Sequence, residues 1–395
     1  MIVVIADDLT GAAELGGFAL RYGLTAEITT KVNPASKADL LIIATDTRSL
    51  PREQAEAVTE QVSSELASLK PRLVFKKVDS VLRGHVLAEI NIQKEKLNLP
   101  KALIVPANPG LGRTVVDGTY LLHGSPLHLS SFSQDPEFPI RSSLVPHMLY
   151  AADGDVQVLK VHEPMPAKGI VVGEVKDAAD LAAWCSKVDE GTLVAGAAEF
   201  FTALLESLHI KPSIPANGIG KLQLPALMIC GSAFHKSRAF IAQMKQEGFP
   251  VNYMPPALIR SGKTNDPLFI EWVEDAIQNL ETFGKAGLAV HPDVQENRQD
   301  ALVIRTLMAE AAACINKHMH IEEFLLEGGS TAAAVIRLLN IKTLYPVASL
   351  APGVTRMRVK GSYDLYLTLK PGSYEWPQAY LLPGRKNGAE QKTDY

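Results

Sequence analysis

Two aspartates and a threonine follow directly on the first apolar run of the chain. The run covers residues 2–6, and Asp7, Asp8 and Thr10 come after it. Five apolar residues are too few for a helix and predict a buried strand, and in parallel α/β sheets ligands bind at the carboxyl ends of strands. Asp8 or Thr10 could instead cap a helix that starts near Ala12. A cap needs one polar residue and this segment supplies three, so we favour a ligand site.

A second polar cluster follows a strand predicted at residues 73–77. It contains Lys77, Asp79, Ser80 and Arg83. The arginine has a planar fork that suits carboxylates and phosphates, while the aspartate and the serine could bind the hydroxyl groups of a sugar. This combination indicates a polyol that carries an acid group. A capped helix with surface lysines is the alternative.

Two more predicted strands end in residues of the same kind. Residues 106–114 contain glycines that let backbone amides approach an anion, and Arg113 is a second candidate for binding a carboxylate. Residues 45–49 place Arg48 and four hydroxyl or carboxyl groups at the end of another strand. Because the carboxyl ends of parallel strands share one edge of a sheet, we expect these segments to form one site. A purely structural loop is the alternative for the irregular stretch at 108–146.

A strand, a glycine pair, two hydroxyls and an apolar helix follow one another at residues 323–339. The amides and the dipole at the start of a helix attract anions, so this order predicts a phosphate-binding loop. Gly231 and Ser232 end another predicted strand, and Gly372 belongs to a Pro-Gly pair that is equally compatible with a type II turn. Neither a Walker A sequence nor a GxGxxG after a strand is present.

The elements that must position these residues alternate between short apolar runs and helical patterns. This alternation predicts a mainly parallel sheet in each half of the chain. The strands expected in the first half are 2–6, 26–30, 40–45, 73–77, 103–106, 169–172 and 192–195, with helices at 52–69, 178–187 and 199–208. Those expected in the second half are 226–230, 251–254, 287–291 and 323–327, with helices at 297–317 and 333–339.

The chain of 395 residues is too long for one ordinary core, so we expect two α/β domains, each a mainly parallel sheet flanked by helices. Two prolines and two glycines within residues 211–220 make that segment the best candidate for a linker. The predicted division is residues 1–210 for the N-terminal domain, 211–225 for the linker, 226–384 for the C-terminal domain and 385–395 for a polar tail.

The composition favours a small-molecule role. A net charge of -4 gives no long-range attraction to nucleic acid or anionic lipid, and no apolar run approaches the length of a membrane span. Cys185, Cys230 and Cys314 lie far apart, which predicts neither a disulfide framework nor a metal site and favours the cytoplasm. His318 and His320 are expected to be solvated. The oligomeric state stays open, a homo-oligomer included.

Together these motifs resemble the four-carbon acid sugar kinase family, formerly grouped as a domain of unknown function, which includes threonate, erythronate and 3-oxo-tetronate kinases. The matching segments occur in the family's order and span nearly the whole chain. They are residues 6–12, 77–84, 106–109, 112–114, 328–331 and 370–372.

The resemblance implies an N-terminal domain that binds the acid sugar, a C-terminal domain that binds ATP, and phosphoryl transfer to a terminal hydroxyl in the cleft between the domains. Mg²⁺ would neutralise charge, and Asp8 or Asp79 would be the carboxylate near the attacking hydroxyl. The other residues implied for the sugar acid are Asp7, Thr10, Arg48, Ser80, Arg83 and Arg113. Those implied for the nucleotide are Ser232, Gly328, Gly329, Ser330, Thr331, Ala332 and Gly372. No protein ligand to a metal is predicted.

The nucleotide half departs from the family's usual pattern. Where the family usually has Gly-Gly-Glu-Thr-Ser, Ser330 replaces the glutamate and Ala332 replaces the last serine. These losses could weaken binding of ATP or Mg²⁺, so a non-catalytic sensor of a sugar acid or nucleotide is the alternative to a kinase. A nicotinamide-dependent dehydrogenase is disfavoured by the missing GxGxxG.

Overall fold

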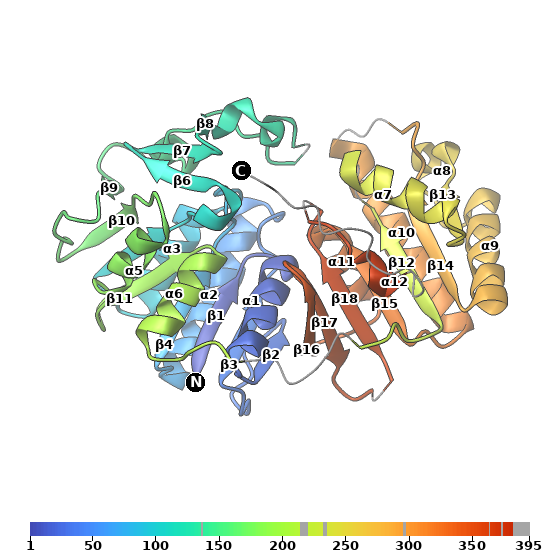
Figure 1. Cartoon of the computed structure of the whole chain (residues 1–395), viewed down its shortest axis with the longest axis horizontal. Coiled ribbons are helices and arrows are strands. Elements are labelled where there is room, and N and C mark those ends of the chain that lie inside the picture. The colour runs from blue at the N-terminus through green and yellow to red at the C-terminus, as the bar shows by residue number, and fades with distance from the viewer. Residues whose placement is uncertain are drawn as a thin grey trace, which may run out of the picture. The chain divides into compact units, whose positions relative to one another are not determined.

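The chain folds into two compact units in the computed structural model, which describes residues 1–135, 137–213, 220–231, 235–294, 298–362, 364–372 and 374–381. The first unit consists mainly of Met1–Ile214, and the second holds most of the remainder. Each unit contains a sheet covered by helices (Figure 1). Most of the predicted linker is described, but residues 214–219 within it and the predicted tail lie outside the described residues.

Eight described strands of the first unit pair in parallel, in the order β2-β3-β1-β4-β11-β5-β10-β9. Thr343 and Leu344, which also belong to this unit, pair antiparallel with β2. Ala6 at the end of β1 lies opposite Ala44 of β3 and Lys77 of β4, so the segments that follow these three strands leave the sheet at one level. The strands are β1 (Ile2–Ala6), β2 (Ala26–Thr29), β3 (Leu40–Ala44), β4 (Leu73–Lys77), β5 (Lys101–Val105), β9 (Gln157–Leu159), β10 (Gly169–Gly173) and β11 (Thr192–Gly196).

Helices of the first unit pack apolar stripes onto this sheet. In α2, for example, Ala55, Val62 and Leu66 are buried on one face. The helix expected near Ala12 begins three residues earlier because Asp8 caps it. The helices are α1 (Leu9–Arg21), α2 (Arg52–Leu69), α3 (Val86–Lys96), α4 (Val145–Met148), α5 (Ala178–Cys185) and α6 (Ala198–Ser207).

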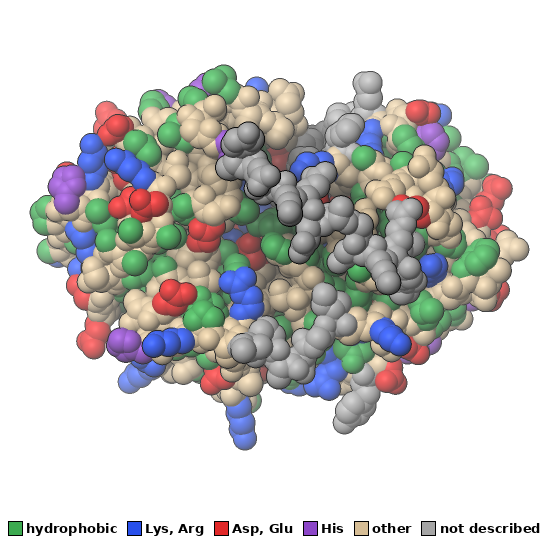
Figure 2. Space-filling model, viewed as in Figure 1, with side chains coloured by type: hydrophobic (Ala, Val, Ile, Leu, Met, Phe, Trp, Pro, Cys, Tyr) green, Lys and Arg blue, Asp and Glu red, His purple; other side chains and the backbone are tan. Residues whose placement is uncertain are grey.

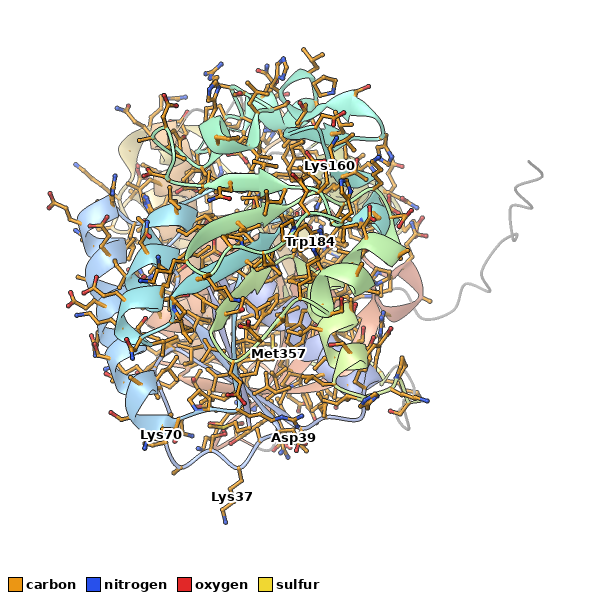
Figure 3. All side chains as sticks on the ribbon, turned by 90° about the vertical axis from the view of Figure 1, so that its left-hand side faces the viewer. Lys37, Asp39, Lys70, Lys160, Trp184 and Met357 are labelled. Carbon is orange, nitrogen blue, oxygen red and sulfur yellow. The ribbon has the colours of Figure 1, made fainter. Side chains whose placement is uncertain are left out.

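Trp184 shows how closely a helix approaches this sheet. Its ring is fully buried and its Nε1 donates a hydrogen bond to the carbonyl oxygen of Glu174 at 2.8 Å. A Cβ at Gly173 would lie 2.6 Å from the ring, so strand β10 must end in glycine for α5 to pack there. In Figure 3, Trp184 lies within the body of the protein, whereas the side chain of Lys37 points away from it.

The stretch at 108–146, which the sequence predicts only as irregular, forms a small antiparallel sheet with short 3₁₀ helices. Its strands are β6 (Arg113–Val116), β7 (Thr119–Leu122) and β8 (Ser125–Pro126), and its 3₁₀ helices are η1 (Pro109–Leu111), η2 (Leu127–Leu129) and η3 (Ser131–Gln134). Tyr120 and Leu127 bury their side chains in the core of the first unit, so the described residues of this segment are anchored to that core.

The second unit has the strand order β13-β14-β12-β15-β18-β17-β16. The first five of these strands pair in parallel, and β17 pairs antiparallel with β18. The strands are β12 (Ala226–Cys230), β13 (Val251–Met254), β14 (Lys285–Val290), β15 (Glu323–Glu327), β16 (Thr343–Ala351), β17 (Val354–Val359) and β18 (Tyr366–Lys370). The helices are α7 (His235–Gln246), α8 (Pro256–Ser261), α9 (Pro267–Phe283), α10 (Arg298–His318), α11 (Gly329–Leu338) and α12 (Gln378–Leu381).

The described surface carries charges of both signs. Acidic and basic side chains are interspersed over the face seen in Figure 2. A search of the described helices finds none with both the length and the apolar character needed to cross a bilayer.

Candidate functional site

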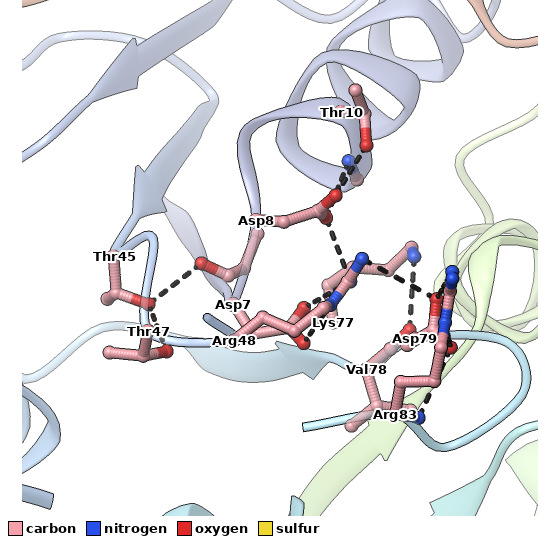
Figure 4. Close-up of polar contacts among 12 residues, drawn as sticks. Asp7, Asp8, Thr10, Thr45, Thr47, Arg48, Lys77, Val78, Asp79 and Arg83 are labelled. Carbon is pink, nitrogen blue, oxygen red and sulfur yellow. Dashed lines mark hydrogen bonds and ion pairs between the residues drawn. The ribbon is translucent and has the colours of Figure 1, made fainter. Parts of the chain in front are cut away.

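The aspartates after β1 are both held by Arg48. Its guanidinium forms two parallel hydrogen bonds with Asp7, from Nε to Oδ2 and from Nη2 to Oδ1, each 2.9 Å long. Nη2 also lies 3.0 Å from Oδ1 of Asp8. The sequence predicted these residues for one site, and the structure brings them together (Figure 4).

Asp8 both caps a helix and faces the site. Its Oδ1 accepts the amide of Gly11 at 2.9 Å and its Oδ2 accepts the hydroxyl of Thr10. A Cβ at Gly11 would lie 2.7 Å from that carboxylate and 3.3 Å from Nζ of Lys77, so only glycine leaves room for this arrangement. The capping and the functional interpretation of this segment are therefore compatible.

The ionisation of Asp8 is set by two opposed effects. Burial alone raises the pKa of its carboxyl group, but the charges of Arg48 and Lys77 and the hydrogen bonds it accepts outweigh burial and lower the pKa. Asp8 is therefore an anion over the physiological pH range.

Asp79 is the most heavily bonded carboxylate of the group. Its Oδ2 accepts Nε of Arg83 at 2.8 Å and the amides of Val81 and Arg83 at 3.2 Å each, and its Oδ1 accepts Nη2 of Arg83 at 2.8 Å. Burial opposes its ionisation, yet the charges of Arg83 and Arg48 hold its pKa well below the usual range. Helix α3 begins only at Val86, so Asp79 closes a turn and does not cap that helix.

Arg48 joins the two candidate catalytic aspartates, because its Nη1 lies 3.6 Å from Oδ1 of Asp79 while its Nη2 contacts Asp8. Its side chain is 13% exposed. The guanidinium between the three carboxylates reduces the repulsion among them, and the charges of Lys77 and Arg83 reduce it further.

Two residues that sequence reasoning did not select, Phe132 and Asp135, complete this group. Nη1 of Arg83 donates to Oδ2 of Asp135 at 2.8 Å. The ring of Phe132 lies 5.8 Å from the guanidinium carbon of Arg83 and 5.4 Å from that of Arg113. Arg113 in turn donates to the hydroxyl of Ser80. The sequence did not indicate which arginine Asp135 would pair with.

The second unit contains the predicted phosphate-binding loop. Gly328 precedes α11 with φ 89° and ψ 132°, a conformation that favours glycine. Its amide donates to the carbonyl oxygen of Lys370 at 2.9 Å, which joins the ends of β15 and β18. Gly329, Ser330, Thr331 and Ala332 form the first turn of the helix, and the amide of Ala332 donates to the carbonyl oxygen of Gly328 at 3.0 Å. The amides and the dipole at such a helix start attract anions.

The remaining residues predicted for the nucleotide lie around this loop. A Cβ at Gly231 would lie 2.5 Å from Oγ1 of Thr331, so the end of β12 touches the start of α11. Gly372 follows β18, two residues beyond Lys370. Ser232 lies outside the described residues.

A buried ion pair under this loop was missed by sequence reasoning. Nζ of Lys370 lies 3.3 Å from Oε1 of Glu327, and Nε1 of Trp376 donates to Oε2 of Glu327 at 2.8 Å. The lysine also donates to the carbonyl oxygens of Pro371 and Tyr374, at 3.0 and 2.8 Å. These contacts tie Lys370 to the end of β15 and to the segment after β18, so Lys370 supports the loop.

Over the part of the chain that the structure describes, no three His, Cys, Asp or Glu side chains are arranged to hold a metal ion.

Comparison with known proteins identifies both halves. Residues 2–203 match the model of a sugar-binding N-terminal domain, and residues 227–374 match that of a nucleotide-binding C-terminal domain.

Two solved structures share the fold across nearly the whole chain, each at 20% identity. One is a Salmonella typhimurium protein described provisionally as a tRNA synthase, with a TM-score of 0.76 and coverage of 96% of this chain and 98% of its own. The other is a DUF1537 protein from Haemophilus influenzae, with a TM-score of 0.69 and coverage of 94% and 97%.

Curated relatives are kinases of four-carbon acids. A D-threonate kinase from Salmonella typhimurium is 29% identical over 60% of this chain and 59% of its own length. A D-erythronate kinase from Heliobacterium modesticaldum is 31% identical over 38% and 36%, and a 3-oxo-tetronate kinase from Cupriavidus necator is 22% identical over 95% and 94%. The chain thus matches somewhat over half the length of the first, about a third of the second and nearly all of the third.

A sugar-binding domain followed by a nucleotide-binding domain, each on an α/β sheet, defines the class of protein. The chain belongs to the four-carbon acid sugar kinase family, as its motifs predicted.

Proposed function

We propose that the protein is an ATP-dependent kinase that phosphorylates a terminal hydroxyl of a four-carbon sugar acid such as threonate, erythronate or 3-oxo-tetronate. The observation that carries the proposal is the group of three aspartates around Arg48 at the end of the first sheet, in a domain whose model is sugar-binding. The named activities of the curated relatives support the substrate class. A cytoplasmic location, where ATP is available, belongs to the same proposal.

Asp8 is the better candidate for the carboxylate that takes the proton of the attacking hydroxyl. Three donors already occupy Oδ2 of Asp79, and Arg83 also binds its Oδ1. On Asp8, Oδ2 accepts only the hydroxyl of Thr10 and retains room for a second donor. Asp79 then positions Arg83, and Arg48 fixes the orientation of Asp8.

The loop at Gly328 fits the phosphates of a nucleotide. The glycine presents no Cβ, and open space surrounds the position where one would stand. Amides of residues 329–331 and the hydroxyls of Ser330 and Thr331 would hold the phosphates. ATP bound with Mg²⁺ supplies the phosphoryl group and offsets its charge. Since Ser330 and Ala332 lack the usual carboxylate and hydroxyl, backbone amides carry most of this binding.

Coupled measurement of ADP release tests the function. The protein with ATP and Mg²⁺ is expected to turn over at least one of D-threonate, D-erythronate and 3-oxo-tetronate, with typical kinase rates of about 1–100 per second. The absence of turnover on every C4 to C6 aldonate would count decisively against a kinase. If calorimetry then showed binding of the acid without binding of ATP, the sensor alternative would be preferred.

Replacement of Gly328 by alanine is expected to raise KM for ATP about tenfold and leave the affinity for the acid unchanged. No atom lies within 4 Å of the new Cβ, so the effect comes from the backbone, which alanine disfavours at φ 89°. Gly361→Ala is a matched control, since Gly361 has φ 84° and equally open surroundings but lies in a turn between β17 and β18. Equal increases of KM in both variants would contradict a phosphate-binding role for the loop.

A further inference from the structure

Among the described residues, four basic side chains lie near the carboxyl ends of the strands of the first sheet, and three of them are neutralised by carboxylates within the unit. Arg48 contacts three aspartates and Arg83 is paired with two. Lys77 lies 3.6 Å from Glu14 and donates to a backbone carbonyl oxygen at 3.0 Å. A ligand anion would have to compete with an internal carboxylate at each of these cations.

Arg113 is the exception. It forms no ion pair with any described residue, its side chain donates one hydrogen bond, to the hydroxyl of Ser80, and its Nε is buried without a partner. The carboxylate of Glu199 acts on it only over a longer distance and accepts the amide of Gly110 at 3.1 Å. The guanidinium is half-buried, and its buried, unused Nε is costly to leave without a partner; a ligand carboxylate would supply the missing acceptor.

The backbone of Arg113 is fixed before any ligand arrives. Its amide donates to the carbonyl oxygen of Asn108 at 3.1 Å, and the amide of Asn108 donates back at 2.9 Å. Gly112 turns the chain into this bridge with φ 66°. A pre-positioned guanidinium loses little conformational freedom when it binds, so more of the interaction energy appears as affinity.

Phe132 shields the same guanidinium from water. Its ring is 5.4 Å from the guanidinium carbon of Arg113, and it packs against the apolar core of the first unit. A cation over an aromatic face is stabilised, and an apolar wall lowers the local dielectric constant, which strengthens an ion pair formed there. The short helix that carries Phe132 is held by the contact between Asp135 and Arg83.

We infer that Arg113 and Phe132 form a subsite that selects acids: Arg113 receives the carboxylate of the sugar acid and Phe132 excludes water from the pair. Arg48 and Arg83 then hold the aspartates of the site in place and do not bind the substrate carboxylate. This inference rests on the proposed function, and it narrows the sequence prediction that assigned all three arginines to the substrate. A polyol without a carboxylate would leave Arg113 unpaired and would be rejected.

Calorimetric titration of the full chain without nucleotide tests the subsite with two probes, D-threonate and its neutral counterpart threitol. The wild type is expected to bind the acid at least about a hundredfold more tightly. In Arg113→Gln the ratio of the affinity for D-threonate to that for threitol is expected to fall below about tenfold, and in Arg113→Lys part of the ratio is expected to return. In Phe132→Leu the ratio is expected to fall severalfold. Arg141→Gln, a change at an exposed arginine on the same segment, leaves it unchanged.

The ratio of the two affinities separates carboxylate recognition from a structural role, because a general disturbance weakens both ligands. A preserved ratio in Arg113→Gln, or a ratio lost in Arg83→Gln and kept in Arg113→Gln, overturns the inference. A wild type that binds neither D-threonate nor D-erythronate also overturns it. Binding with the expected ratio but without turnover supports the subsite and contradicts the proposed kinase instead.

Discussion

Replacing Asp8 by asparagine is expected to lower kcat by about a thousandfold while the affinity for the sugar acid stays within about fivefold of the wild-type value. A positioned general base contributes on the order of 10²–10⁴ to the rate, and asparagine keeps the shape but cannot accept the proton. Its amide oxygen can still accept the backbone amide of Gly11, and its NH2 group can donate to the hydroxyl oxygen of Thr10, so α1 keeps its cap. Single-turnover kinetics and calorimetry with D-threonate measure the two quantities separately.

Asp79→Asn is the matched comparison. This variant keeps the charge of Asp8 but loses the charge that pairs with Arg83 and Arg48, which loosens the group around the site, so it is expected to raise the KM for the acid more than it lowers kcat. If Asp79→Asn instead showed the thousandfold loss of kcat and Asp8→Asn did not, the roles of the two aspartates would be reversed.

The pH dependence follows from the direction of the shift at Asp8. The pKa of Asp8 is lower in the folded protein than in the unfolded chain, so ionised Asp8 stabilises the fold at every pH above the unfolded-state pKa. This stabilisation is lost as the pH falls through the folded-state pKa. Between about pH 5 and pH 8 Asp8 is ionised in both states. We therefore expect no acid limb from Asp8 in the profile of kcat over that range.

The carboxyl ends of the first sheet could be predicted from the sequence because each strand there is a short apolar run that stops at polar residues. β1, β4 and β12 have the predicted bounds, and α2 does as well. Helix α1 begins at Leu9, earlier than predicted. Asp8, which the sequence suggested for a ligand site, is also the residue that caps this helix. The alternation of strand and helix was sufficient to predict a parallel sheet in each unit.

Strands β16 to β18 were missed because their sequences mix charged, hydroxyl and apolar residues. The buried arginine of this region is neutralised by a residue distant in sequence: Arg356 of β17 pairs with Glu323 of β15 at 3.0 Å. Likewise, the sequence around Arg113 does not show that this arginine has no carboxylate partner. The sequence around Arg83 does not show that its partner is Asp135, 52 positions away. Partners of this kind depend on the tertiary fold, so sequence patterns select the candidate residues but not the pairs they form.

Lys76 and Glu89 form an ion pair that no proposed chemistry uses, and breaking it is expected to lower the free energy of unfolding of the first unit by about 3–5 kcal/mol. Both side chains are 1% exposed. Lys76→Met leaves the glutamate as a buried unpaired charge, while the double variant Lys76→Met, Glu89→Leu removes both charges and is expected to recover most of the loss. Lys101→Met, at a pair whose Asp189 is 57% exposed, should cost under about 1 kcal/mol.

Tryptophan fluorescence during urea unfolding can report on the first unit alone. Trp184 is the one tryptophan of this unit, and the double variant Trp272→Phe, Trp376→Phe removes the other two in the chain.

Oε1 of Glu89 and both polar atoms of the Gln93 side chain are buried without a hydrogen-bond partner, so the ion pair lies among polar atoms that are not fully hydrogen-bonded. Gln93→Leu should therefore stabilise the unit. Equal destabilisation in the single and double variants would show that Lys76 and Glu89 do not depend on each other. Recovery in the double variant would instead show that the unit is destabilised by one buried charge without its partner, and that it tolerates the loss of both charges together.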